Sequence, residues 1–146
     1  MEPSFEIISY VGAKPLLFGM TERQVEAIIG PPETIMTNGL GEPDASYESF
    51  SIRYSKQDKK LVEIGFSKTA RVTILGINPF TQKHGFHDLV RKDSCPYESY
   101  GFIILLDLGI TLTGFHDNDP DQLAITAFVR GRWNDDKIEF HKFQLP

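Results

Sequence analysis

Cysteine is almost absent from this chain, because Cys95 is the only one among its 146 residues and no disulfide can form within the chain. Small secreted domains usually depend on disulfides, so a single cysteine favours a reducing compartment. The longest nearly apolar run, residues 102–106, is far too short to cross a bilayer. Residues 1–6 lack the basic start and apolar stretch of a secretory signal. Together these absences predict a cytoplasmic protein without membrane spans.

Positive charge is also scarce, and the formal net charge of −5 argues against nucleic acid as a partner, since phosphate binding needs a basic face. Two long stretches, residues 24–52 and 93–129, contain no Lys or Arg. One interpretation is solvated loops whose charges interleave with those of other segments in the folded protein. The other is an acidic face that meets a basic partner. The acids that this second interpretation uses are Glu42, Asp44, Glu48, Glu98, Asp117, Asp119 and Asp121.

Familiar signatures of catalysis and metal binding are missing as well. The acids from Asp117 to Asp121 alternate as in a calcium loop, but the sixth and twelfth positions of such a loop hold Gln122 and Phe128. The histidines show no closed ligand set, and Cys95 has no neighbouring base in the sequence to lower its pKa. No Gly-x-Ser-x-Gly or His-Glu-x-x-His pattern occurs. We therefore expect no catalytic residues, no metal and no cofactor.

The clearest local signal is a short helix that starts after Thr21. Thr21 and Gln24 have the spacing of a capping box, and Val25, Ile28 and Ile29 form an apolar stripe at helical spacing. Gly30 and the two prolines after it end the helix.

Strands dominate the rest of the sequence. Alternating patterns predict strands at residues 46–54, 61–67, 71–75, 102–106, 110–115, 123–129 and 137–143, with a polar turn at 116–121 and a second helix around 87–92. Residues 71–75 are expected to continue an antiparallel meander. These elements predict a single α+β domain, residues 1–146, in which short helices pack on an antiparallel sheet.

The second half looks like a looser copy of the first, with halves at residues 17–76 and 77–143. Tyr97-Glu-Ser-Tyr100 echoes Tyr47-Glu-Ser-Phe50, and a strand at 123–129 matches the apolar spacing of the strand at 61–67 only roughly. A degenerate tandem repeat of a helix followed by strands is the resulting interpretation.

The segment 18–32, with Gly19-Met-Thr21 at its opening and Ile29-Gly-Pro31 at its close, resembles the β-lactamase inhibitor proteins and the related small outer-membrane assembly lipoproteins. That resemblance covers at best half of the chain and implies a helix packed on an antiparallel sheet, often in tandem. Cys95 lies mid-chain, so it matches neither an N-terminal lipidated cysteine nor a disulfide staple. The resemblance thus implies a cytosolic relative, similar to immunity proteins that neutralise a bacterial toxin.

These observations predict a non-catalytic immunity-type inhibitor that binds a toxin or another protein with a basic surface. Aromatic residues within or near the acidic stretches are candidate anchors, although the same residues would serve equally as core-facing members of strands. They are Tyr47, Tyr97, Tyr100 and Trp133. One alternative is a small enzyme or a ligand-binding domain with a cleft at the sheet surface. Another is a chaperone or assembly adaptor, which an exposed apolar sheet face would favour.

Overall fold

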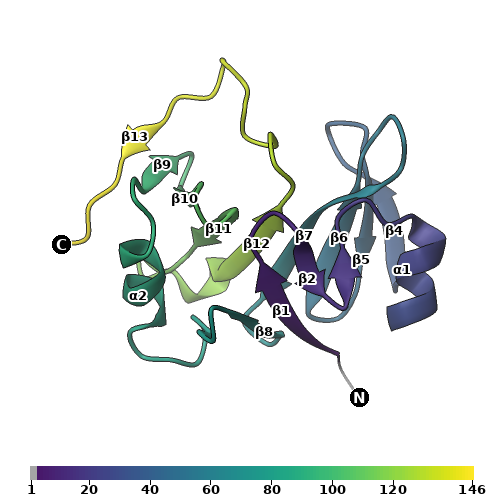
Figure 1. Ribbon diagram of the computed structural model, residues 1–146, viewed down its shortest axis with the longest axis horizontal. Coiled ribbons are helices and arrows are strands. Elements are labelled where there is room, and N and C mark those ends of the chain that lie inside the picture. The colour runs from purple at the N-terminus through teal and green to yellow at the C-terminus, as the bar shows by residue number, and fades with distance from the viewer. Residues whose placement is uncertain (1–2) are drawn as a thin grey trace.

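The computed structural model describes residues 3–146 and confirms an α+β fold with a mostly antiparallel sheet. A nine-stranded sheet has the order β13-β9-β10-β11-β12-β7-β6-β5-β4, and a four-stranded sheet has the order β3-β2-β1-β8 (Figure 1). The strands are β1 Ser4–Ile8, β2 Gly12–Lys14, β3 Leu16–Leu17, β4 Thr34–Thr37, β5 Pro43–Ser46, β6 Phe50–Tyr54, β7 Leu61–Ser67, β8 Arg71–Ile74, β9 Tyr97–Ser99, β10 Phe102–Leu105, β11 Ile110–Thr113, β12 Ala124–Phe128 and β13 His141–Lys142.

The first helix, α1 (Glu22–Ile29), is confirmed together with its capping box. The Gln24 amide donates to Thr21 Oγ1 at 3.3 Å, and the Thr21 amide donates to Gln24 Oε1 at 2.9 Å. The second helix, α2 (Gly85–Arg91), begins two residues before the expected range. Gly85 packs so closely on the Asn78–Pro79 backbone that a Cβ there would lie 2.8 Å from Pro79 Cα, which explains a glycine inside the first turn.

Each helix is followed by four strands that pair in sequence order. Strands β4 to β7 follow α1 and strands β9 to β12 follow α2, and the last strands of the two units, β7 and β12, pair antiparallel in the middle of the sheet. The similar apolar spacing in β7 and β12 thus belongs to topologically equivalent strands. The Tyr-Glu-Ser echo does not, because residues 47–50 lie at the turn between β5 and β6, whereas 97–99 form β9.

Three expectations about strands were wrong. Strand β8 does not continue the meander but pairs in parallel with β1, a strand that was not predicted although Ser4 to Ile7 alternate polar and apolar residues. Residues 46–54 are two strands, because the Tyr47 amide bonds the Phe50 carbonyl in a turn. Only His141 and Lys142 of the last expected strand pair with β9, since Phe140 packs its ring against Trp133 and Tyr97 instead of extending the ladder.

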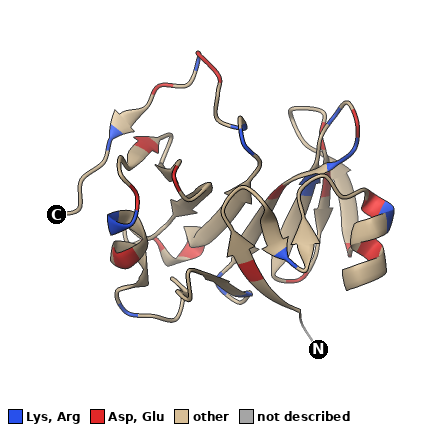
Figure 2. Cartoon of the chain, in the orientation of Figure 1, with Lys and Arg blue, Asp and Glu red and all other residues tan. Residues whose placement is uncertain are grey.

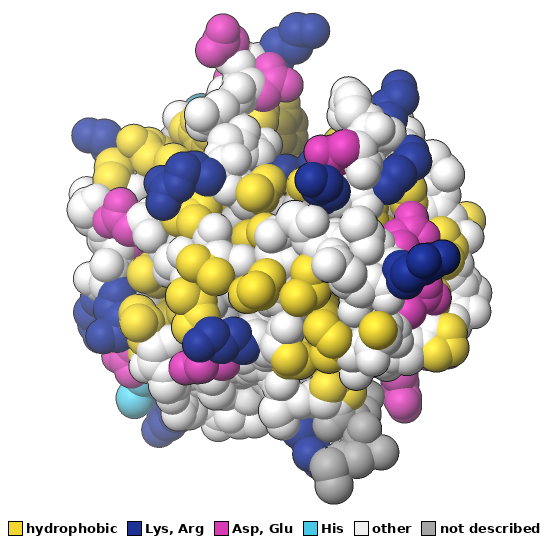
Figure 3. Space-filling view, turned by 45° about the vertical axis from the view of Figure 1, so that its right-hand side comes forward, with side chains coloured by type: hydrophobic (Ala, Val, Ile, Leu, Met, Phe, Trp, Pro, Cys, Tyr) yellow, Lys and Arg dark blue, Asp and Glu magenta, His cyan; other side chains and the backbone are white. Residues whose placement is uncertain are grey.

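The core lies between the nine-stranded sheet and the layer formed by the small sheet and the helices. Alternate residues of β6 and β7 are fully buried there, among them Ile52, Ile64 and Phe66. Phe5 from β1 contacts Phe66 with ring centroids 5.1 Å apart, so the small sheet is tied directly to the large one. One side of the molecule carries a band of hydrophobic side chains between charged ones (Figure 3).

Candidate functional site: a hydroxyl-lined trough

The face of the nine-stranded sheet that turns away from the core carries a row of small polar side chains. Starting from β5, the register places Ser46 opposite Ser51 of β6 and Ser51 opposite Gly65 of β7. It then places Gly65 opposite Thr126 of β12, and Thr126 opposite Thr111 of β11. Side chains of cross-strand partners stand on the same face of a sheet. Five adjacent strands, from β5 to β11, therefore contribute one continuous row of serine, threonine and glycine.

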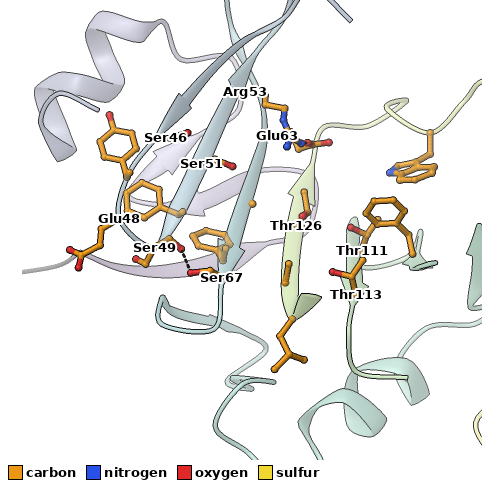
Figure 4. Close-up of a pocket in the computed structure, with 18 residues that line it drawn as sticks. Ser46, Glu48, Ser49, Ser51, Arg53, Glu63, Ser67, Thr111, Thr113 and Thr126 are labelled. Carbon is orange, nitrogen blue, oxygen red and sulfur yellow. Dashed lines mark hydrogen bonds and ion pairs between the residues drawn. The ribbon is translucent and has the colours of Figure 1, made fainter. Parts of the chain in front are cut away.

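This row forms the floor of a pocket of about 490 Å³, which we call the trough. Gly65 lies at its centre, where a Cβ would contact Ser51 Oγ at 3.4 Å and Thr126 Oγ1 at 3.5 Å. The short side chains leave backbone within reach of whatever occupies the trough. Figure 4 shows Ser51, Thr126 and Thr111 along the floor, with Glu48 at one end and Arg53 beside Glu63 at the other.

Aromatic residues form the two sides of the trough. On one side Trp133 packs edge-on against Phe102, with ring centroids 5.8 Å apart. On the other side Tyr47 stacks on Phe50 at 4.6 Å. The Tyr47 hydroxyl donates to the Gly30 carbonyl at 2.9 Å, and burial raises the pKa of Tyr47 to about 12. The hydroxyl of Tyr47 therefore stays protonated and holds the end of α1, while its ring packs on the core residue Phe50 beside the trough.

An ionic cluster lies at one end of the trough. Arg53 Nε lies 3.1 Å from Asp44 Oδ2, and a second Arg53 nitrogen contacts Glu63. Arg132 bonds Glu63 Oε1 through Nε at 3.2 Å and Glu42 Oε1 through Nη2 at 2.8 Å. These hydrogen bonds from Arg132 hold the pKa of the buried Glu42 carboxyl at about 2, well below its usual value. Glu42 therefore remains ionised at neutral pH, and the cluster ties the C-terminal segment to the sheet.

The trough continues past this cluster into a second pocket of about 380 Å³. The two pockets share Arg53, Glu63 and Trp133 as lining residues. The second pocket extends to Leu40 on the β4–β5 turn and to Ile138 on the C-terminal segment. Together they make a groove that is longer than either pocket.

The opposite end of the trough carries three acids and one base, Lys68, which directly follows β7. Strands β6 and β12 both pair antiparallel with β7, so they run in the same direction and the turns that precede them lie at the same end of the sheet. Those turns carry Glu48, Asp117 and Asp121, which are exposed and form no ion pair within residues 3–146. Elsewhere the charges are mixed, and both helices carry acidic and basic residues (Figure 2).

The structure distributes the predicted partner-binding residues over several places. Tyr47, Glu48 and Trp133 line the trough, whereas Glu42 and Asp44 are held in ion pairs with arginines. The carboxylate of Glu98 on β9 lies 3.1 Å from His116 Nε2. Asp119 accepts the Asp121 amide and caps the 3₁₀ helix Pro120–Gln122 in the predicted turn.

Tyr97 and Tyr100 lie at the β9–β10 hairpin. Tyr97 packs on Phe140, and Tyr100 is 82% exposed at the tip. The row of serine, threonine and glycine on the trough floor was not predicted from the sequence. Leu40 and Arg132 were not predicted as site residues either. The alternation of small polar and apolar residues in β6 and β12 marked one face of each strand, but only the register aligns these faces into a floor.

No group of three or more His, Cys, Asp or Glu in the described part of the chain is placed to hold a metal ion. Neither of the two described α-helices is long and apolar enough to cross a membrane. Comparisons of the chain with family models, with curated proteins and with solved structures found no match.

Proposed function

We propose that this chain is a non-catalytic, immunity-type binding protein that holds a segment of a partner protein, a bacterial toxin, in the trough. The observation that carries the proposal is the form of the groove. Its floor of small side chains crosses five strands, and it continues into a second pocket. A polypeptide segment fits such an elongated groove, whereas small ligands favour compact cavities that bury most of their surface.

Two exposed apolar side chains at the ends of the sheet supply anchors for a protein partner. Tyr100 is 82% exposed and Leu40 is 71% exposed. They lie at the tips of topologically equivalent hairpins, β9–β10 and β4–β5. Tyr100 and Gly101 have φ values of 51° and 83°, as the two central residues of a tight β-hairpin turn require, so the turn projects Tyr100 into solvent. Large side chains of this kind contribute much of the binding energy in protein interfaces.

The charge of the trough favours a basic partner. Glu48, Asp117 and Asp121 are unpaired acids at one end, and the chain as a whole carries a net charge of −5. Such a field speeds the encounter with a positively charged surface. The toxin as partner, and the cytoplasm as the place of action, rest on the resemblance of residues 18–32 and on the sequence-based expectations.

The experiment compares two arginine substitutions on half-buried strand threonines. Thr126→Arg places a long side chain in the middle of the trough floor, and Thr73→Arg on β8 places the same side chain on the small sheet. Each variant is co-expressed with the toxin-domain protein encoded beside it, and cell survival is measured. We expect Thr126→Arg to lose protection and Thr73→Arg to keep it, with both variants folded by circular dichroism. Protection by a folded Thr126→Arg protein, or no protection by the wild type, would overturn the proposal.

A ligand-binding domain is the second candidate, because a volume of about 490 Å³ also lies within the range of small-molecule sites. Native mass spectrometry of the purified protein distinguishes the two. A bound metabolite that Thr126→Arg removes would favour the ligand.

A further inference from the structure

The nine-stranded sheet ends in two unlike edge strands. At one edge β13 is two residues long, and its His141 and Lys142 are polar. At the other edge β4 has four residues, all exposed, with neither a charge nor a proline. Ile35 is 53% exposed and Met36 is 70% exposed. Proteins usually protect edge strands with charges, prolines or bulges, because an open edge pairs readily with another strand.

The ladder between β4 and β5 is longer than the assigned strand. The Glu33 amide donates to the Ser46 carbonyl at 2.8 Å, and the Asn38 amide donates to the Glu42 carbonyl at 2.9 Å. The extended edge therefore runs from Glu33 to Asn38. It ends at the β4–β5 turn, where the Leu40 amide bonds the Asn38 side chain.

Helix α1 does not cover this edge. The residue before its cap is tied to the start of β7, because the Leu61 amide donates to the Met20 carbonyl at 2.8 Å. Its other end is tied to the β5–β6 turn through the bond from Tyr47 to Gly30. All four residues of β4 are exposed beside the helix, so the outer side of β4 stays open to a strand.

We propose that β4 pairs antiparallel with β4 of a second copy of this chain. Antiparallel pairing of identical strands requires a two-fold axis normal to the sheet, and that axis keeps each side chain on its own face. An axis at Met36 satisfies this condition and sets Ile35 opposite Thr37 of the second copy. It also sets Thr34 opposite Asn38.

The chemistry of the strand favours its own copy. All residues from Thr34 to Asn38 are uncharged, so no like charges meet across the axis. The cross-strand pair of Ile35 and Thr37 is β-branched on both sides, which suits a sheet. The two Met36 side chains meet on the trough side and remove their exposed surface from water.

The dimer would place both troughs on the same face of one continuous sheet, since the axis is normal to that sheet. A short strand pair buries less area than a stable interface needs, so the dimer is a weak one that forms at high protein concentration. Two troughs side by side would let the dimer hold two segments of one partner.

Sedimentation equilibrium tests this inference on the full chain, from about 10 µM to about 1 mM, a range that brackets weak association. We expect the average mass to rise toward twice that of one chain. Ile35→Lys and Met36→Lys should each hold the mass at one chain. Leu75→Lys is the matched control, since Leu75 is an exposed leucine in a turn after β8, and it should dimerise like the wild type.

Hydrogen exchange identifies the surface used. Amides of residues 33–38 should exchange more slowly at the high concentration than at the low one, and the remaining amides should not change. A wild type that stays monomeric throughout the range overturns the inference. So does a dimer that Leu75→Lys abolishes, or one whose protection lies outside residues 33–38.

Discussion

Arg132 forms a bidentate ion pair with Glu42, which lies 90 positions earlier in the chain. Arg132 Nη2 is 2.8 Å from Glu42 Oε1, and Nη1 bonds the other carboxylate oxygen. Glu42 is only 6% exposed, so the pair lies inside the protein. It joins the C-terminal segment, which carries Trp133 into the wall of the trough, to the turn between β4 and β5. The shape of the groove therefore depends on this ion pair.

Glu42→Gln should lower the free energy of unfolding by about 2 kcal/mol at neutral pH, because it removes the charge of a buried, hydrogen-bonded pair. The folded-state pKa of Glu42 is depressed from 4.5 to about 2, so its contribution is fully present above about pH 4.5 and is lost as the pH falls toward 2. Urea unfolding of wild type and variant should therefore converge in that acidic window. Glu48→Gln, at an exposed position without an ion pair, should match the wild type. A difference that does not change with pH would contradict the assignment.

Thr21→Ala should cost about 1 kcal/mol of stability through loss of the helix cap. The cap is visible as the bond from the Gln24 amide to Thr21 Oγ1. Thermal unfolding measures the effect, and Thr81→Ala, at an exposed threonine ahead of α2, is the control. Equal melting temperatures for the wild type and Thr21→Ala would mean that the cap contributes nothing.

Tyr100→Ala and Leu40→Ala should each weaken binding of the partner about tenfold, in the range typical of interface anchors. Neither should change the melting temperature, because both side chains are mostly exposed. Affinity is measured by titration calorimetry with the purified toxin domain. Leu75→Ala removes another exposed leucine, one that lines neither pocket, and should bind like the wild type. Unchanged affinity in both variants would exclude the hairpin tips from the interface.

Reversing the acidic end of the trough, with Glu48, Asp117 and Asp121 changed to Lys, should slow association about tenfold at low salt. The effect should fade as salt rises, because screening at physiological ionic strength acts beyond about 8 Å. Stopped-flow binding supplies the rates. The control makes the same charge change at three exposed acids on other elements, Glu6, Glu33 and Asp88. If both triple variants slow association equally, net charge rather than the acidic end is responsible.

Much of the secondary structure was predictable because its causes lie within a few residues. The cap at Thr21, the stripe from Val25 to Ile29 and the stop at Gly30 are all local, and the structure confirms the helix. Alternation in β7, β10 and β12 likewise predicted strands within a residue or two of their observed bounds. The α+β class follows from these elements alone.

Pairing between distant segments could not be predicted in this way. Nothing local in residues 71–75 distinguishes a parallel partner of β1 from one more strand of a meander. The Tyr-Glu-Ser echo was misleading because its three matching residues stand at positions that the topology does not make equivalent.

The sequence by itself determined where the chain turns, which residues are apolar and that one face of each central strand is small and polar. Only the tertiary structure decided that Ser51, Gly65 and Thr126 lie side by side, because register depends on contacts between strands that are far apart in the chain. It also decided that Glu42 and Asp44, two acids of a stretch without bases, are neutralised by Arg132 and Arg53. Burial makes such pairing necessary, since an unpaired charge inside a protein costs far more than one in water.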